Sequence, residues 1–222
     1  MTSEAVRHQL SFAVRFIDHF SREPVTAELP VRLAGSFQRP ASQPGGRSRR
    51  QVDGSYRFTN ALPGAQRILW RDPMTRTQSG WARWDEAEPE VTLPLADPAV
   101  RTEFELWPTA DADAPLGLAG VRGKLDGPDA GGLDVRIAQQ GQPFGRFTRS
   151  DLNGEFLYPL GGRLPLNTTG LIALTIEARI PGGAVRVLGG GRFLPASTGA
   201  SFGAADFEIA PGNVARIRFR LT

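Results

Sequence analysis

Residues 153–160 read Asn-Gly-Glu-Phe-Leu-Tyr-Pro-Leu, and this short stretch indicates the fold. An Asn-Gly pair favours the tight turn of a β-hairpin, because both residues accept backbone angles that most residues avoid. After the turn, large apolar side chains return at every second position, at Phe156, Tyr158 and Leu160. Successive side chains of a strand point to opposite faces, so the stretch predicts a turn followed by a strand with one buried face.

The same alternation recurs along the whole chain of 222 residues. The 26 glycines and 18 prolines are spread through the sequence and disfavour long helices. The alternating residues are Leu10, Phe12, Val14 and Phe16; Leu29, Val31 and Leu33; Val91, Leu93 and Leu95; Thr102, Phe104 and Leu106; Leu133, Val135 and Ile137; Ile172, Leu174, Ile176 and Ile180; Val185 and Val187; Phe207 and Ile209; and Ile217, Phe219 and Leu221. We therefore expect an all-β protein of antiparallel β-sandwiches, in which each sheet buries one face.

The sequence also contains a diverged internal repeat. Segments of the first half return in the same order in the second half, at an offset of roughly 100 residues, the size of one small sandwich domain. The matched segments are Val14-Arg15 with Val121-Arg122, Val31-Arg32-Leu33 with Val135-Arg136-Ile137, and Asp53-Gly54-Ser55-Tyr56 with Asn153-Gly154-Glu155-Phe156. The repeat predicts two tandem Ig-like antiparallel sandwich domains, residues 1–97 and 98–222, divided in the turn-rich segment 96–99.

The second repeat carries a more specific pattern. Thr148, Asp151, Gly154 and Phe156 follow the spacing Thr-x-x-Asp-x-x-Gly-x-Phe, after a Val-Arg-Gly-Lys-Leu strand that begins at Val121. This pattern resembles the carboxypeptidase regulatory-like (transthyretin-like, prealbumin-type) β-sandwich family, and the first repeat fits it more loosely. The resemblance implies accessory, stabilising or recognition modules.

Enzyme activity is not expected. His8 and His19 flank the first expected strand, and at about 3.3 Å per residue they lie roughly 36 Å apart, too far to meet in one protomer. A metal bridged between protomers through either histidine is left open. The chain also ends without the Tyr-Arg-Gly-Ser sequence of the transthyretin-like hydrolases. Glu103 and Glu105 share a strand face, which is typical of a solvated face, with a glycosidase pair as the alternative. We predict no catalytic residue, no cofactor and no metal site.

A calcium loop is the alternative for the turn at Asp151, Asn153 and Glu155. An EF-hand loop needs a glutamate at its twelfth position, and that position, counted from Asp151, is Gly162. The hairpin turn is therefore the favoured interpretation.

The charge balance argues against nucleic-acid binding. The formal net charge is only +3, whereas a nucleic-acid binder presents a concentrated basic face. The basic cluster within residues 45–50 lies among Gly and Ser and predicts a loop, with an anionic partner as the alternative. Residues 1–10 hold no apolar core of a signal peptide, and no later run is long enough to insert into a membrane. We therefore expect a cytoplasmic protein, with release as part of a larger particle left open.

One candidate binding segment is rich in tryptophan and arginine. Both types are enriched at interface hot spots, and aromatic rings also bind sugars. The candidates are Trp70, Arg76, Trp81, Arg83 and Trp84. Trp81 and Trp84 are three residues apart and would point to opposite faces of one strand, so at least one of them is expected in a core.

The C-terminal strand supplies the second candidate. Arg216, Arg218 and Arg220 alternate with apolar residues and share one face. Such a stripe is typical of the water side of a final strand. If it is a binding surface, an acidic protein surface is the natural partner, because arginine pairs well with carboxylates.

These features favour a non-catalytic structural or adaptor protein that binds other protein subunits, for example within a phage-tail-like particle. The alternative is a carbohydrate-binding or cell-surface recognition module.

Overall fold

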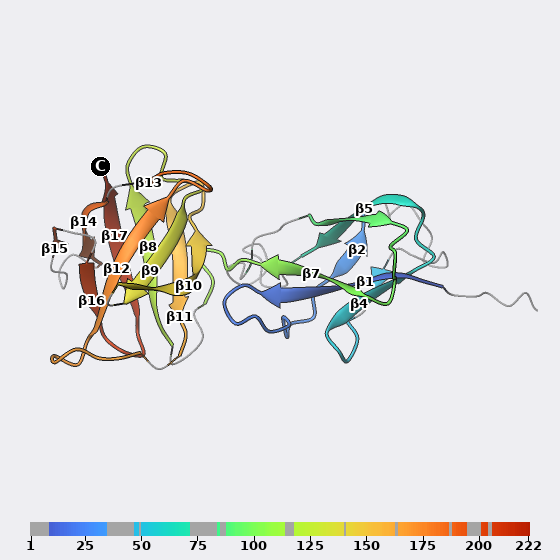
Figure 1. Ribbon diagram of the computed structural model, residues 1–222, viewed down its shortest axis with the longest axis horizontal. Helices are drawn as coiled ribbons and strands as arrows, with labels where there is room; N and C mark the ends of the chain where they lie inside the picture. The colour runs from blue at the N-terminus through green and yellow to red at the C-terminus, as the bar shows by residue number, and fades with distance from the viewer. Residues whose placement is uncertain are drawn as a thin grey trace, which may run out of the picture. The chain divides into compact units, whose positions relative to one another are not determined.

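The computed structural model has strands, turns and loops, and no helix in the part of the chain that it describes (Figure 1). The described residues are 9–34, 47–48, 50–71, 84, 88–113, 118–139, 141–162, 164–186, 188–194, 201–203 and 206–222. Within these ranges no helical segment could cross a membrane. The chain divides into two compact units, unit 1 (Met1–Leu106) and unit 2 (Trp107–Thr222). The all-β sandwich prediction is confirmed.

Unit 1 has two sheets in its described residues. The first has the strand order β4-β1-β7, formed by β1 (Leu10–Asp18), β4 (Ser55–Thr59) and β7 (Arg101–Leu106). The second has the order β3-β2-β5-β6, formed by β2 (Val31–Leu33), β3 (Arg47–Ser48), β5 (Gly64–Trp70) and β6 (Glu90–Leu93). The alternating apolar residues of both sheets enter one core.

Aromatic rings pack both within and between the two sheets of unit 1. Phe12 on β1 stacks on Phe58 of β4, with ring centroids 4.7 Å apart. Phe16 on β1 contacts Trp70 on β5 across the core, at 5.7 Å between centroids. The large apolar side chains predicted for these strands therefore meet inside unit 1, where their burial supplies most of the stabilisation.

The described residues of unit 2 form two larger sheets. The order β11-β8-β17-β14-β15 is formed by β8 (Ala119–Asp126), β11 (Glu155–Leu160), β14 (Leu188–Phe193), β15 (Ser201–Phe202) and β17 (Val214–Leu221). The order β10-β9-β12-β13, with β16 also paired to β12, is formed by β9 (Asp134–Gln139), β10 (Gln142–Arg149), β12 (Ile172–Arg179), β13 (Val185–Arg186) and β16 (Asp206–Ile209).

Phenylalanine rings form the centre of the unit 2 core. Phe219 on β17 lies 5.5 Å from Phe207 on β16 and 6.1 Å from Phe156 on β11, between ring centroids. Phe207 belongs to one sheet and the other two rings belong to the opposite sheet, so this cluster holds the two layers together.

The two units share one strand arrangement. The order β4-β1-β7 of unit 1 corresponds to β11-β8-β17 of unit 2, and β3-β2-β5-β6 corresponds to β10-β9-β12-β16. Strands β13, β14 and β15 have no counterpart among the described residues of unit 1. The sequence repeat therefore coincides with a repeat of the sheet topology.

The first and last strands of each unit run parallel. Strand β1 pairs in parallel with β7, and β8 pairs in parallel with β17. A wholly antiparallel arrangement was expected, but the last strand of each unit returns from the opposite sheet in the same direction as the first. The pairing of β7 with β1 also places the division between the units after Leu106, beyond the predicted boundary at residue 97.

Asp53 organises the turn that leads into β4. Its Oδ1 accepts hydrogen bonds from the Ser55 hydroxyl at 2.6 Å and from the Ser55 backbone N–H at 3.0 Å. Its Oδ2 lies 2.9 Å from Arg101 and 3.5 Å from Arg57. These two hydrogen bonds, and then the two guanidinium groups, lower the pKa of Asp53 from 3.8 to about 2.

Unit 1 is expected to lose part of its stability as the pH falls from about 4 towards about 2. An acid whose pKa is lowered by folding binds more protons in the unfolded state, so its stabilisation is present above its unfolded pKa and is lost on acidification. Ser55→Ala removes the hydroxyl donor and should raise the pKa of Asp53 towards its ordinary value. NMR titration of the Asp53 carboxyl group measures this change, and an unchanged pKa would assign the effect to the other contacts.

Candidate functional site

The two described tryptophans of the candidate Trp/Arg segment lie in the core of unit 1. Trp70 is 6% exposed and Trp84 is 9% exposed. The Trp84 indole Nε1 donates a hydrogen bond to Asp18 Oδ2 at 3.1 Å. Both rings therefore pack in the core, and neither offers a ring face to a ligand. Arg76, Trp81 and Arg83 lie outside the described residues.

The arginines of the C-terminal strand lie on the outer face of unit 2. Arg216 and Arg220 are exposed and Arg218 is partly exposed. The residues between them, Ile217 and Phe219, are almost fully buried in the core. The alternation along β17 therefore separates a charged face from a packed one, as the sequence pattern predicts.

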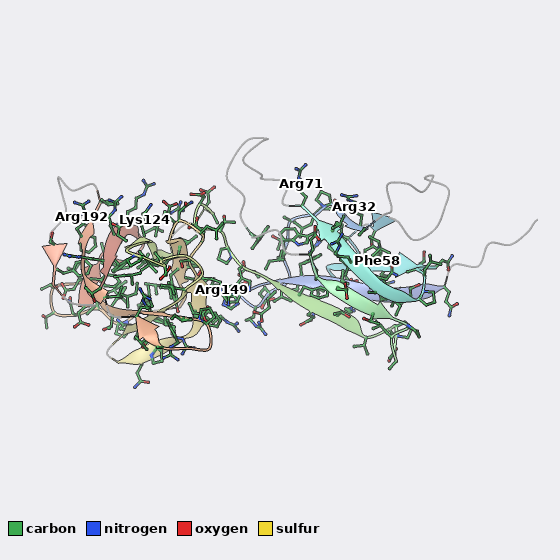
Figure 2. All side chains as sticks on the ribbon, turned by 90° about the horizontal axis from the view of Figure 1, so that it is seen from above. Arg32, Phe58, Arg71, Lys124, Arg149 and Arg192 are labelled. Atoms are coloured by element: carbon green, nitrogen blue, oxygen red, sulfur yellow. The ribbon has the colours of Figure 1, made fainter. Side chains whose placement is uncertain are left out.

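Neighbouring strands extend this stripe into a wider surface. The parallel register of β8 and β17 pairs Arg122 with Arg216 and Lys124 with Arg218. The antiparallel register of β14 and β17 pairs Arg192 with Arg218. Paired residues of adjacent strands project from the same face of a sheet. We call this surface the basic face, formed by Arg122, Lys124, Arg192, Arg216, Arg218 and Arg220; Lys124 and Arg192 mark it in Figure 2.

Carboxylates form ion pairs with only some of the cationic side chains of the basic face. Arg218 Nε lies 3.2 Å from Asp126 Oδ2, and Lys124 Nζ lies 3.5 Å from Glu155 Oε1. Within the described ranges no carboxylate forms an ion pair with the exposed Arg192, Arg216 or Arg220. Like charges opposite each other across adjacent strands are destabilising, so the face keeps an electrostatic cost that carboxylates from outside could offset.

Arg122 is the most enclosed cation of the basic face. Burial and the neighbouring Arg216 guanidinium lower the pKa of Arg122, while Asp113 and Glu155 act in the opposite direction. Its Nη2 donates a hydrogen bond to the backbone carbonyl oxygen of Ala112 at 2.5 Å. Arg122 therefore fixes the segment before β8 and leaves the arginines of β17 and β14 as the accessible part of the face.

Unit 1 provides an internal comparison for this arrangement. Arg15 on β1 matches Arg122 in the sequence repeat, and its register partner on β7 is Glu103. Arg15 Nε donates a hydrogen bond to Glu103 Oε1 at 3.0 Å. The equivalent pairing in unit 2 places Arg122 beside Arg216. One topology thus carries a neutralised charge pair in unit 1 and a row of like charges in unit 2.

The other charged residues of β7 are also paired. Arg101 contacts Asp53, and Glu105 contacts both Arg22 and His19, with 2.8 Å between Glu105 Oε2 and His19 Nδ1. The carboxylates considered for a glycosidase pair therefore engage cationic or histidine partners. His8 lies outside the described residues.

The described residues contain no group of three or more His, Asp or Glu side chains arranged to hold a metal ion. Asp151, considered as a calcium ligand, accepts backbone hydrogen bonds from Asn153 and Glu155 through Oδ1, both at 2.8 Å. Gly154 has a φ of +78°. This is the geometry of a turn stabilised by an aspartate side chain. The turn joins β10 to β11, which belong to opposite sheets, so the prediction of a β-hairpin here is wrong.

Sequence reasoning found one strand of the basic face and missed the other two. Arg122 and Lys124 were visible as alternating charges in the second repeat, but their place beside β17 depends on a pairing between segments far apart in the sequence. Arg192 lies on β14, for which the described part of unit 1 has no counterpart.

No protein-family model and no curated protein matches this chain. Among solved structures it is similar to the Bacillus anthracis TIE protein, with a TM-score of 0.31 and 10% identity over 96% of this chain and 34% of that one. It therefore spans about a third of that chain. It is also similar to GBS52, the minor pilin of the Gram-positive pathogen Streptococcus agalactiae, with a TM-score of 0.25 and 8% identity over 96% of this chain and 97% of the other. With both TM-scores below 0.5, neither likeness decides a family or a function.

Proposed function

We propose that this protein is a non-catalytic structural or adaptor protein that binds another protein through the basic face of unit 2. The observation that carries the proposal is the row of like charges on β8, β17 and β14. In unit 1, β1 and β7, which correspond to β8 and β17, carry an ion pair at the equivalent position. A sequence usually avoids such local conflicts except where function requires them. Arginine is also the cation best suited to paired hydrogen bonds with carboxylates. An acidic protein surface is the partner that fits this face.

The proposal is tested by removing charge from the exposed part of the basic face. The variant Arg192→Gln/Arg216→Gln/Arg220→Gln keeps long polar side chains and loses three positive charges. Partners captured from the source cells should be identified for the wild type and the variant, and the dissociation constant of each purified partner should then be measured by calorimetry. We expect at least one partner to bind the variant about tenfold or more weakly, because truncating a paired interfacial charge costs more than 1.4 kcal/mol.

A control variant changes the same net charge on the other sheet. Arg146→Gln/Arg179→Gln/Arg186→Gln alters β10, β12 and β13, and should bind the partner like the wild type. Equal weakening by both triple variants would show a general charge effect and contradict the proposal. Equal binding by all three proteins would also contradict it.

The carboxypeptidase regulatory-like type is part of the same proposal. Its support is the turn at Asp151 and Gly154 that leads into the buried Phe156, and the equivalent turn at Gly54 in unit 1. The cytoplasmic location and the phage-tail-like setting stay predictions from the sequence. The carbohydrate-binding alternative depended on the tryptophan segment, whose described rings are buried.

A further inference from the structure

The basic face ends in a pocket of about 590 Å³ beside the short strand β15. Strands β14, β15 and β17 and the turn after β8 form its walls. The polar and aromatic lining residues are Asp126, Arg192, Ser201, Phe202, Arg218 and Arg220. The pocket therefore lies where an extended ligand running along the arginines of β17 would reach the C-terminal end of that strand.

Glycines shape the β14 wall of this pocket. Gly189, Gly190 and Gly191 are consecutive lining residues. Gly190 has a φ of +102°, and a Cβ at this position would lie 2.2 Å from the backbone carbonyl oxygen of Phe202. Only glycine allows the two backbones to approach this closely. The pocket therefore depends on a local sequence that is unfavourable for an ordinary strand.

Positive side chains outnumber negative ones among the residues that line the pocket. Asp126 is the one carboxylate among the described residues that line it, and its Oδ2 lies 3.2 Å from Arg218 Nε. Arg192 and Arg220 line the same space, are exposed, and form no ion pair with any carboxylate in the described ranges. A carboxylate group that enters the pocket could therefore form ion pairs with the guanidinium groups of Arg192 and Arg220, which no carboxylate in the described ranges pairs with.

We propose that this pocket holds a carboxylate side chain of an extended acidic segment of the partner protein, an inference that rests on the proposed function. Residues two apart on a strand are separated by about 6.6 Å, and the side chains of an extended peptide repeat at the same distance. A segment with carboxylates at alternate positions would therefore match Arg216, Arg218 and Arg220 along β17. One carboxylate then enters the pocket between Arg192 and Arg220.

The acidic residues of the face favour such a segment over a uniform polyanion. Asp126 and Glu155 lie among the arginines and lysine, where they would repel an unbroken row of phosphate or sulfate groups. A protein segment can place carboxylates opposite the arginines and uncharged side chains opposite Asp126 and Glu155, which avoids this repulsion. The partner is therefore defined by the positions of its charges and not by charge density alone.

Ser201 provides a sharp test, because it is exposed and lines the pocket. Ser201→Glu places a resident carboxylate in the site, and Ser201→Gln adds a side chain of the same size without the charge. The probe is a fluorescein-labelled peptide, Glu-Thr-Glu-Thr-Glu-Thr-Glu, with binding followed by fluorescence anisotropy on the full chain. We expect Ser201→Glu and Arg192→Gln each to weaken binding about tenfold, and Ser201→Gln to change it less than about threefold. Circular dichroism of each variant confirms that it is folded.

Any other outcome contradicts the proposal that the pocket binds a carboxylate side chain of the partner. No binding of the peptide to the wild type, or equal binding to Ser201→Glu and Ser201→Gln, contradicts the inference while the partner-capture experiment still decides the proposed function. Tighter binding of inorganic polyphosphate than of the peptide, weakened by the same variants, would identify a polyanion site instead. Failure of both the peptide and the capture experiment would remove the proposed function together with the inference.

Discussion

Phe156→Ala is expected to lower the free energy of unfolding of unit 2 by about 3–5 kcal/mol. The Phe156 ring is fully buried and stacks on Phe219 at 6.1 Å between centroids. It also covers Gly123 on β8, where a Cβ would lie 2.1 Å from the ring. Truncation removes these contacts and leaves a cavity beside a glycine, which has no side chain to fill it.

Urea unfolding, monitored by hydrogen exchange of the amides of unit 2, measures this loss in the free energy of unfolding. Leu152→Ala is the matched control, because Leu152 lies in the turn before β11 and is 97% exposed. We expect the control to change the free energy of unfolding by less than about 0.5 kcal/mol. A loss below about 1 kcal/mol for Phe156→Ala would show that the ring is not central to the core.

Gly154→Ala is expected to destabilise unit 2 by about 3 kcal/mol, and the equivalent Gly54→Ala to destabilise unit 1 by only about 1–2 kcal/mol. The two glycines occupy matching turns and have almost equal φ angles, +78° and +77°. A Cβ at Gly154 would lie 2.5 Å from the carbonyl oxygen of Leu125, whereas the nearest atoms at Gly54 are 3.4 Å away. Backbone strain is common to both positions, and the backbone clash exists only in unit 2.

Unfolding of the two single variants, resolved by hydrogen exchange of each unit, gives this comparison. The difference between the two losses isolates the clash, since the strain of the left-handed conformation largely cancels. Equal losses at both positions would show that the turn of unit 2 relaxes away from Leu125 without cost.

Local patterns allowed most of the strands to be predicted. Phe156, Tyr158 and Leu160 are buried side chains of β11, as their alternation predicts, although Leu157 on the opposite face is buried as well. Alternation of apolar residues does not predict burial correctly at the ends of the strands. Ile180 and Val185 were placed on the apolar face and are 43% and 49% exposed, because they flank the turn closed by the Ile180 N–H and the Ala184 carbonyl oxygen.

The candidate site could be predicted only in part. The exposure of Arg216 and Arg220 follows from alternation within one strand. Their proximity to Arg122 and Arg192 follows from pairing with β8 and β14, and no local pattern specifies which strands become neighbours. The burial of Trp70 could not be decided from sequence either, since a large aromatic residue suits both a core and an interface.

The parallel pairing of β8 with β17 determines how unit 2 would carry tension. The register runs from Gly120 with Val214 to Asp126 with Arg220. A pulling force that enters unit 2 through its first strand and leaves through its last would draw these two strands in opposite directions along their length. The hydrogen bonds between them would then share the load, instead of opening one after another from an end.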